Sequence, residues 1–320
     1  AAQGSGFSYS AEQAQAIEDA ATTGLLLVTG GPGTGKTTVL KGILSLYEQM
    51  GLRCVLAAPT GRAAKRLTEV TGEEASTIHR LLGAGIDPHT GELVFTKNEE
   101  DPLNADAIIV DEMSMVDVQL LYSLLKAIPG NKRLILVGDS NQLPSVGAGN
   151  VLSDILESGA MPAGELTEIF RQDEKSMIVH NAHRINHGEA PRLNAKGSDF
   201  FFERAASPVD AANRIVQLCA VRLPKFLGLD PVRQMQVLSP TKKGDCGVWM
   251  LNQLLQEQFN PSAKHKNERV RGDVTFREGD KVMQTRNNYQ LKWKKEGVFA
   301  WEEGQGVFNG DIGFVTEIDE

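Results

Sequence analysis

The stretch that most constrains the fold of this chain is GGPGTGKTT at residues 30–38, which follows the apolar run LLLV at 25–28. From Gly30 to Thr37 it fits the pattern G-x-x-x-x-G-K-[ST] in full. Glycines in this pattern let the backbone fold around phosphate oxygens, with N–H groups pointing inward at the start of a helix. A glycine-rich turn with an exposed lysine is the alternative, but the strand and helix patterns on either side favour a nucleoside triphosphate site.

The side chains of this loop have separate predicted roles. Lys36 neutralises the β and γ phosphates, and the Thr37 hydroxyl completes the coordination shell of Mg²⁺. ATP and Mg²⁺ are therefore the expected cofactors. The residues expected to bind the nucleotide are Gln13, Gly31, Pro32, Gly33, Thr34, Gly35, Lys36, Thr37 and Thr38.

An acidic pair supplies the carboxylates that a phosphate loop needs. The apolar run AIIV at 107–110 ends in Asp111 and Glu112. At the tip of a neighbouring strand, Asp111 would hold the magnesium ion and Glu112 would polarise the attacking water as general base. An acidic turn that caps the following helix is the alternative, and the phosphate loop makes the catalytic interpretation the preferred one.

Three polar side chains outside these motifs are further candidates. Gln142 follows the apolar run at 134–137 and either belongs to a polar loop that ends at a proline or contacts both the γ-phosphate and the attacking water through its amide. Gln13 either lies exposed behind the helix-capping Ser10 or binds the adenine edge, since an amide both donates and accepts. Arg171 either forms a surface ion pair or stabilises transition-state charge from a second domain.

Composition bounds the class of protein. With 320 residues, 41% hydrophobic and 23% charged, the chain is long enough for roughly two globular domains. No apolar run approaches the ~20 residues that span a bilayer, and the start shows no signal peptide pattern. The net charge of −8 argues against nonspecific coating of nucleic acid but allows a local basic groove. Cys54, Cys219 and Cys246 lack metal-site spacing, which indicates free thiols in a reducing cytoplasm.

The order of apolar runs predicts an α/β fold. Strands are expected at 25–29, 54–58, 107–110 and 134–137, with helical patterns between them. Buried strands that alternate with helices indicate a parallel sheet covered on both faces. A β-hairpin is expected at about 83–104, and a strand of a second sheet at 235–238. From residue 271 onward, turn signals and β-branched residues predict a small β-module.

Taken together, these stretches resemble the motifs of superfamily 1 helicases, and most closely the RecD-like DNA helicases that include the exodeoxyribonuclease V alpha subunit. The segments that carry the resemblance occur in family order at 10–13, 30–38, 58–64, 76–79, 110–114, 138–149 and 166–172, followed by 239–241, 279–288 and 308–313. The first seven of these segments extend over residues 10–172, about half of the chain. The resemblance implies a bacterial enzyme of DNA repair and recombination, in which ATP hydrolysis drives 5′→3′ movement on single-stranded DNA and duplex unwinding.

The resemblance also assigns functional residues. The catalytic set is Lys36, Glu112, Gln142 and Arg171. The DNA-binding set is Pro59, Thr60, Gly61, Arg62, Thr77, His79, Leu143, Pro144 and Ser145. The segment 59–62 follows a strand and starts a helix, so it would grip a phosphate without reading bases. For His79 a packed ring is an equal alternative, and the hairpin is either a strand-separating pin or a surface hairpin without a duplex role.

Two other clusters carry weaker hypotheses. His180, His183 and His187 share a helical face, as zinc ligands would, but no further ligand is near and Arg184 intervenes, which favours a solvated face. Between residues 289 and 307, lysines alternate with Trp293 and Trp301 in a way that suits either a strand-binding groove or a solvated loop.

The predicted architecture is a P-loop NTPase with three parts. A RecA-like motor domain is expected at 9–163, a partial second RecA-like domain at 164–265, and the start of an SH3-like β insertion at 266–320. The family's last motifs do not occur in the sequence, so these residues alone are expected to bind nucleotide but to unwind duplexes poorly and to turn over ATP weakly. We expect a monomer acting on single-stranded DNA and duplex junctions, with other recombination or repair subunits as possible partners. The alternatives are an ATPase with a substrate other than nucleic acid, an RNA motor, or a nucleotide-binding switch subunit.

Overall fold

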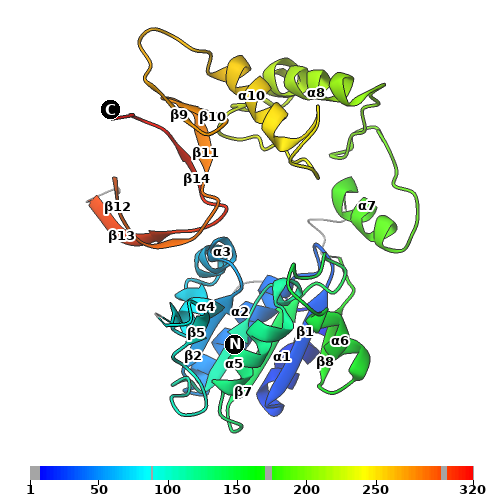
Figure 1. The fold of residues 1–320 in the computed structure, drawn as a ribbon. Helices are drawn as coiled ribbons and strands as arrows, with labels where there is room; N and C mark the ends of the chain where they lie inside the picture. The colour runs from blue at the N-terminus through cyan, green and yellow to red at the C-terminus, as the bar shows by residue number, and fades with distance from the viewer. Residues whose placement is uncertain (1–7, 88, 170–174, 297–300, 320) are drawn as a thin grey trace. The chain divides into compact units, whose positions relative to one another are not determined.

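The chain folds into two compact units, divided between Phe201 and Phe202. The computed structural model describes residues 8–87, 89–169, 175–296 and 301–319. The first unit is an α/β domain around a six-stranded parallel sheet, as predicted (Figure 1). Among the described residues, no helix is both long and apolar enough to cross a bilayer.

The six strands have the order β3-β2-β6-β7-β1-β8. The elements of the first unit are α1 (Ala11–Thr22), β1 (Leu25–Gly30), α2 (Lys36–Gln49), β2 (Cys54–Ala58), α3 (Gly61–Thr71), β3 (Ala75–Thr77), α4 (Ile78–Leu81), β4 (Ala84–Ile86), β5 (Leu93–Phe95), β6 (Ala107–Val110), a 3-10 turn (Met113–Met115), α5 (Val118–Lys126), β7 (Arg133–Gly138), α6 (Val151–Ser158), β8 (Ala163–Leu166) and α7 (Met177–Asn186). All pairings in this sheet are parallel. The carboxyl ends of its strands therefore meet at one edge.

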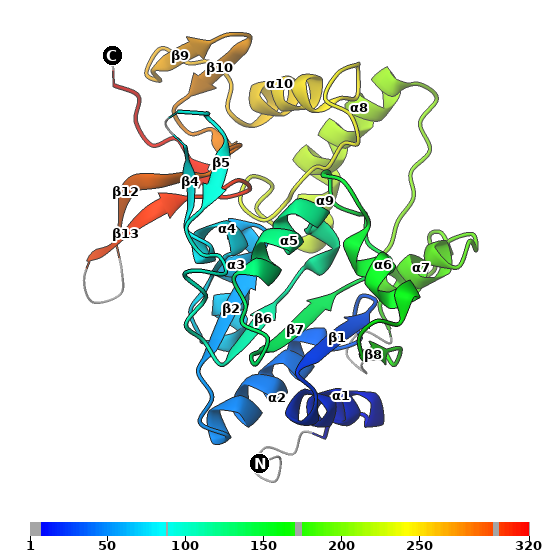
Figure 2. The same cartoon turned by 60° about the horizontal axis from the view of Figure 1, so that its bottom comes forward.

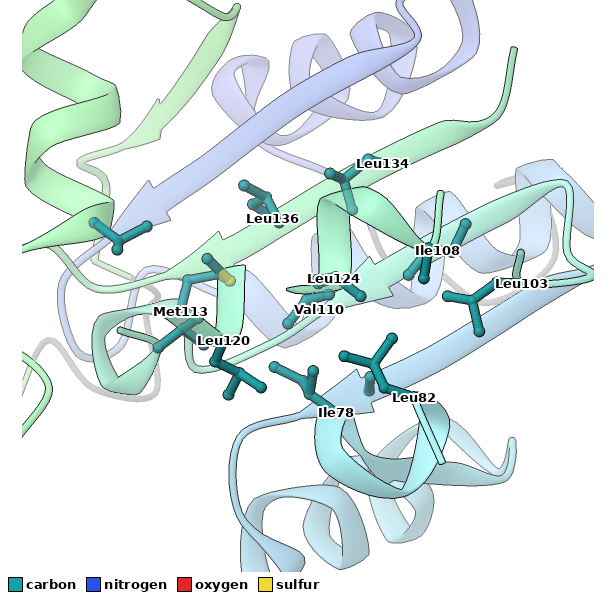
Figure 3. Packing of buried hydrophobic residues seen from close by; sticks show 14 of the residues in the cluster. Ile78, Leu82, Leu103, Ile108, Val110, Met113, Leu120, Leu124, Leu134 and Leu136 are labelled. Carbon is teal, nitrogen blue, oxygen red and sulfur yellow. The ribbon is translucent and has the colours of Figure 1, made fainter. Parts of the chain in front are cut away.

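Alternation along the central strands builds a core on each face of the sheet. In β6, Ile108 and Val110 join one buried cluster, and Ala107 and Ile109 join the other. The first cluster takes in residues of α4, α5 and α6, including Leu120 and other side chains shown in Figure 3. The second takes in residues of α1, α2 and α3, with α1 and α2 packed side by side (Figure 2). Because both faces are covered, the strands consist of continuous apolar runs.

The predicted hairpin is confirmed as the antiparallel pair β4 and β5, in which Ala84 lies opposite Phe95. Its base is closed by the backbone: Lys97 N donates to the carbonyl of Leu82 at 3.0 Å, and Thr96 N to that of Gly83 at 3.3 Å. The hairpin therefore begins directly after α4, and its second strand ends beside Leu82 and Gly83, where the first strand begins.

The division between the units lies later than the sequence suggested. The expected boundary at residues 163 and 164 falls inside β8, which pairs with β1 along Leu27 to Gly30. This pairing places β8 in the sheet of the first unit, and α7 also belongs to that unit.

The second unit begins with helices and ends in paired strands. Its elements are α8 (Pro208–Gln217), a π-helical turn (Leu218–Arg222), α9 (Leu223–Leu227), α10 (Val248–Phe259), β9 (Glu268–Arg271), β10 (Val274–Arg277), β11 (Lys281–Met283), β12 (Asn288–Glu296), β13 (Trp301–Val307) and β14 (Ile312–Phe314). Strands β9 and β10, β11 and β14, and β12 and β13 form three antiparallel pairs, which confirms the predicted β-module.

The strand expected at 235–238 is absent from the part of the second unit that the structure describes. The Met235 carbonyl instead accepts a hydrogen bond from Lys281 Nζ at 2.7 Å, and Leu238 is 87% exposed. A buried polar group joins α10 to the β-module: Asp280 accepts from Asn260 Nδ2 at 2.7 Å and from the Arg277 N–H at 2.8 Å.

Candidate nucleotide and nucleic-acid site

The phosphate-binding loop links β1 to α2 and depends on two left-handed glycines. Gly33 has φ 76° and Gly35 has φ 80°, a region that residues with a Cβ rarely enter. Gly35 immediately precedes α2, so Lys36 is the first helical residue. Inside the loop, buried Thr34 donates from Oγ1 to the carbonyl of Gly31 at 2.9 Å. The backbone is therefore held in a tight curve at a helix N-terminus, as an anion site requires.

Lys36 lies within the loop, where Nζ donates to the carbonyls of Gly30 and, at 3.0 Å, Gly31. Burial lowers the pKa of this ammonium group, while the charges of Asp139, Glu112 and Asp111 oppose that shift. One cation thus shares this edge of the sheet with three carboxylates.

The acidic pair lies at the end of β6, as predicted. The Asp111 N–H donates to the Ala57 carbonyl at 3.0 Å, and Asp111 Oδ1 accepts from the Glu112 N–H at 2.8 Å. Glu112 itself is left-handed, with φ 57° and ψ 42°, a conformation that costs a non-glycine residue about 1–2 kcal/mol. Burial raises the pKa of both carboxyl groups, and each lies close enough to Lys36 and Arg66 for these cations to counter the shift.

Strand β6 is not the direct neighbour of the P-loop strand, because β7 lies between them. The end of β7 adds a carboxylate that sequence reasoning did not single out. Asp139 is 1% exposed and accepts from the Asn141 N–H at 3.0 Å and from Gln142 Nε2 at 3.4 Å. Asp139 therefore fixes the start of the loop that carries Gln142, and its signal in the sequence was a charge directly after the buried run 134–137.

The loop after Gln142 exposes apolar side chains. Leu143 is 88% exposed and Val146 is fully exposed, while Ser145 Oγ donates to the Gly147 carbonyl at 3.1 Å. Farther along, the Ala148 carbonyl accepts from the first N–H of α5 at 3.0 Å. The loop is thus anchored at both ends and open to solvent between them.

Gln13 is buried, in contrast to the exposed glutamine of one interpretation. Its Oε1 accepts from the Ser10 N–H at 3.2 Å, and the Ser10 hydroxyl accepts from the Gln13 N–H, which together form a capping box at the start of α1. Its Nε2 donates to the Thr34 carbonyl at 3.2 Å. The amide therefore joins α1 to the P-loop, and its predicted contact with adenine stays a prediction.

The preceding residue makes a second connection. Glu12 accepts from the N–H and hydroxyl of Thr167 at 2.7 and 2.6 Å, and from the Glu168 N–H at 3.3 Å. This carboxylate holds the chain just after β8. Arg171, the predicted arginine of the transition state, lies outside the described residues.

The predicted phosphate grip begins α3. Thr60 caps the helix, because its hydroxyl accepts from the Ala63 N–H at 3.2 Å. Pro59 is half-buried and Gly61 is buried. Arg62, Lys65 and Arg66 are exposed on the first two turns, and among the described residues none of the three has a carboxylate within 4.0 Å. Cations at the positive end of a helix repel its dipole, so this surface favours an anion from outside the chain.

The next DNA candidates lie where β3 meets α4. Thr77 is buried, and its hydroxyl caps α4 by accepting from the Arg80 N–H at 3.2 Å. The His79 ring packs on Phe95 of the hairpin with centroids 5.9 Å apart, and burial lowers the pKa of the imidazole against an opposing effect of Asp117. Of the two interpretations of His79, the structure thus shows the packing contact.

The predicted solvated face of α7 is only partly solvated. His187 is exposed, but His183 is half-buried and lies against the P-loop, with Nε2 3.3 Å from the Pro32 carbonyl. Sequence reasoning missed this contact because it joins segments 151 residues apart.

Comparisons with known proteins bear on this site. A family model described as an AAA domain matches residues 13–148, and one described as the ATP-dependent RecD-like DNA helicase SH3 domain matches residues 251–320. The ATP-dependent RecD2 DNA helicase of Deinococcus radiodurans is 39% identical over 310 residues, which are 97% of this chain and 38% of that protein. The chain belongs to the RecD-like DNA helicase family.

Two further proteins, one curated relative and one solved structure, also match the chain. The RecBCD enzyme subunit RecD of Mycolicibacterium smegmatis is 33% identical over 345 residues, covering 98% of this chain and 58% of that subunit. A crystal structure of the Pif1 helicase from Candida albicans matches at a TM-score of 0.49 and 20% identity, covering 97% of this chain and 69% of that one. The RecD-like chain described here thus spans about two fifths to three fifths of the two curated relatives.

The two family models match separate parts of the RecD-like chain, one within the first unit and the other within the second. The AAA model extends from Gln13 to Ala148 and so takes in the P-loop, the acidic pair and Gln142. The SH3 model begins at residue 251 within α10, earlier than the predicted start at residue 266. The buried contacts of Asp280 with Asn260 and Arg277 show why α10 and the strands form one unit.

Proposed function

We propose that this chain is the ATP-binding motor part of a RecD-like helicase. ATP hydrolysis at the P-loop drives 5′→3′ movement on single-stranded DNA and separation of duplex strands. The observation that carries the proposal is the gathering of Lys36, Asp111, Glu112 and Asp139 at the carboxyl edge of one parallel sheet. The same edge leads into α3 and the exposed loop after β7, so a strand bound there would lie beside the nucleotide.

The donors at this edge suit Mg²⁺ and ATP. The Thr37 hydroxyl and the Asp111 carboxylate are hard oxygen ligands, and one Asp111 oxygen is left when the other accepts the Glu112 N–H. The bound ion would neutralise charge on the phosphates. Lys36 binds the β and γ phosphates, Gln142 contacts the γ-phosphate and the water, and Glu112 takes a proton from that water, a role helped by its raised pKa. Arg171 would supply positive charge to the transition state.

The DNA contacts are proposed along α3, α4 and the loop after β7. Pro59, Thr60, Gly61 and Arg62 form the first phosphate site, Thr77 the second, and Leu143, Pro144 and Ser145 the third. His79 lies next to the second site and packs on Phe95 of the hairpin. Partners are proposed from two relatives. One is named a DNA helicase and the other a subunit of the RecBCD enzyme, so association with repair subunits is proposed as well as the monomer.

Steady-state ATP hydrolysis with and without oligo(dT) tests the proposal. We expect turnover, however weak, to rise with oligo(dT), and to be lost in both Lys36→Ala and Glu112→Gln, with ATP binding retained only in Glu112→Gln. Turnover that ignores the oligonucleotide would favour an ATPase acting on another substrate. Polarity is tested with duplexes that carry either a 5′ or a 3′ single-stranded tail, where any unwinding, however slow, should require the 5′ tail.

A further inference from the structure

The P-loop has a neighbour with no part in the proposed chemistry. The imidazole of His183, on α7, lies directly on Gly31, because a Cβ added to this glycine would stand 2.6 Å from His183 Cε1. Its Nε2 atom lies 3.3 Å from the Pro32 carbonyl. A carbonyl only accepts hydrogen bonds, so the ring donates from Nε2 in this contact.

The same backbone is held from within the loop. The Gly31 carbonyl accepts from Thr34 Oγ1 at 2.9 Å and from Lys36 Nζ at 3.0 Å. His183 adds to these a contact with Gly31 and Pro32 that comes from a distant part of the chain. The φ of Gly31 lies outside the left-handed region, so a glycine is required here to make room for the ring and not to relieve backbone strain.

Helix α7 is well fixed for such a role. Asn181 is 0% exposed and bonds Arg192 in both directions, accepting from its N–H at 2.7 Å and donating to its carbonyl at 2.9 Å. At the start of the helix, Asp199 accepts from the Ser176 hydroxyl and from the Met177 N–H, each at 2.6 Å. The chain after α7 thus folds back on the helix and holds it, together with His183, in one orientation.

We propose that His183 is a positioning residue of the ATP site. Its imidazole supports the Gly31–Pro32 backbone in the shape that binds phosphate, and it couples the position of α7 to the nucleotide. This role rests on the proposed function, because it concerns the same P-loop. It predicts that loss of the ring weakens ATP binding while the chemical step, carried by Lys36 and Glu112, keeps its rate once ATP is bound.

Equilibrium binding of a fluorescent N-methylanthraniloyl derivative of ATP, with Mg²⁺, tests the proposal on the whole chain. His183→Ala should raise the dissociation constant about three- to tenfold, as expected for one lost hydrogen bond with its packing. His183→Gln keeps a donor near the Nε2 position and should restore binding to within about twofold. Ile185→Ala truncates a side chain of the same helix that is 55% exposed, and it serves as the control, with unchanged binding.

A double-substitution cycle tests the contact itself. Gly31→Ala pushes the ring away and should weaken binding as His183→Ala does, while the double variant should be no worse than either single variant. Unchanged binding in His183→Ala, additive losses in the cycle, or a failure of His183→Gln to rescue would each overturn the proposal. If Lys36→Ala binds the probe as well as the unsubstituted chain, the proposed function has failed instead.

Discussion

Glu112 shows what the catalytic role demands of a single residue. It occupies a left-handed conformation beside Asp111, and burial followed by the charge of Asp111 raises the pKa of its carboxyl group. A raised pKa in the folded state means that folding favours the protonated form. The ionised form, which a general base needs, therefore reduces stability at neutral pH.

Replacement of Glu112 by Gln should separate these two effects. We expect Glu112→Gln to abolish ATP turnover and to raise the melting temperature at pH 7 by roughly 2–4 °C, which corresponds to about 1 kcal/mol in a domain of this size. The gain should shrink as the pH falls through the raised pKa, because the native carboxyl is then neutral as well. Thermal unfolding over a series of pH values from 7 downward measures the gain and its decline. A variant that melts lower than the unsubstituted chain at pH 7 would contradict this explanation.

At the scale of elements, the sequence predicts the strands that are buried and that a local apolar run defines. The four central strands were found because β1, β2, β6 and β7 are continuous apolar runs in a two-faced sheet. The edge strands β3 and β8 were missed, since they are short, partly exposed and lack an apolar run.

The site shows the same limit. The P-loop and the acidic pair follow from local patterns, whereas three contacts depend on which distant segments meet. These are the bond from Gln13 to Thr34, the packing of His79 on Phe95, and the approach of His183 to Pro32. The run at 235–238 failed as a predicted strand for a related reason: apolar periodicity does not tell whether a partner strand will be present.

The start of α1 supplies an element-scale prediction. Burial would raise the pKa of Glu12, but hydrogen bonds from Thr167 and Glu168 outweigh it and lower that pKa. We expect Glu12→Ala to destabilise the chain at pH 7 by about 1 kcal/mol, a modest value because solvent screens the contact. A depressed pKa stabilises above the unfolded value of 4.5, so the loss should fade as pH drops through the folded value. Urea unfolding measures it, with exposed Glu18→Ala as control; equal effects of the two would refute it.

A second element-scale prediction concerns the junction of α4 with the hairpin. Because the His79 ring is packed on Phe95 and its pKa is lowered by burial, we expect His79→Leu to keep affinity for labelled oligo(dT) within about twofold. Arg62→Ala, which removes an exposed cation from α3, should weaken binding several-fold under the same conditions. Fluorescence anisotropy gives both values. A loss in His79→Leu as large as that in Arg62→Ala would show that the imidazole contacts the strand directly.

For the whole molecule, charge decides how DNA is held. The chain carries 41 acidic and 33 basic side chains, so an overall attraction to a polyanion is ruled out. Binding has to come from local cations. Three cations on the first two turns of α3, Arg62, Lys65 and Arg66, have no carboxylate within 4.0 Å among the described residues. Lys97 and Lys132, in contrast, are paired with Asp101 and Asp106.

This contrast predicts the salt dependence of DNA binding. Each phosphate contact on a single strand contributes about −0.7 to the slope of log K against log salt concentration. If Arg62, Lys65 and Arg66 each neutralise one phosphate, replacing all three by Ala should make the slope shallower by about 2. Replacing Lys97 and Lys132 by Ala should leave it within about 0.3, because those cations are already paired on the surface. Anisotropy titrations with oligo(dT) between low and moderate salt measure the slopes, and equal slopes for the two variants would place the strand elsewhere on the molecule.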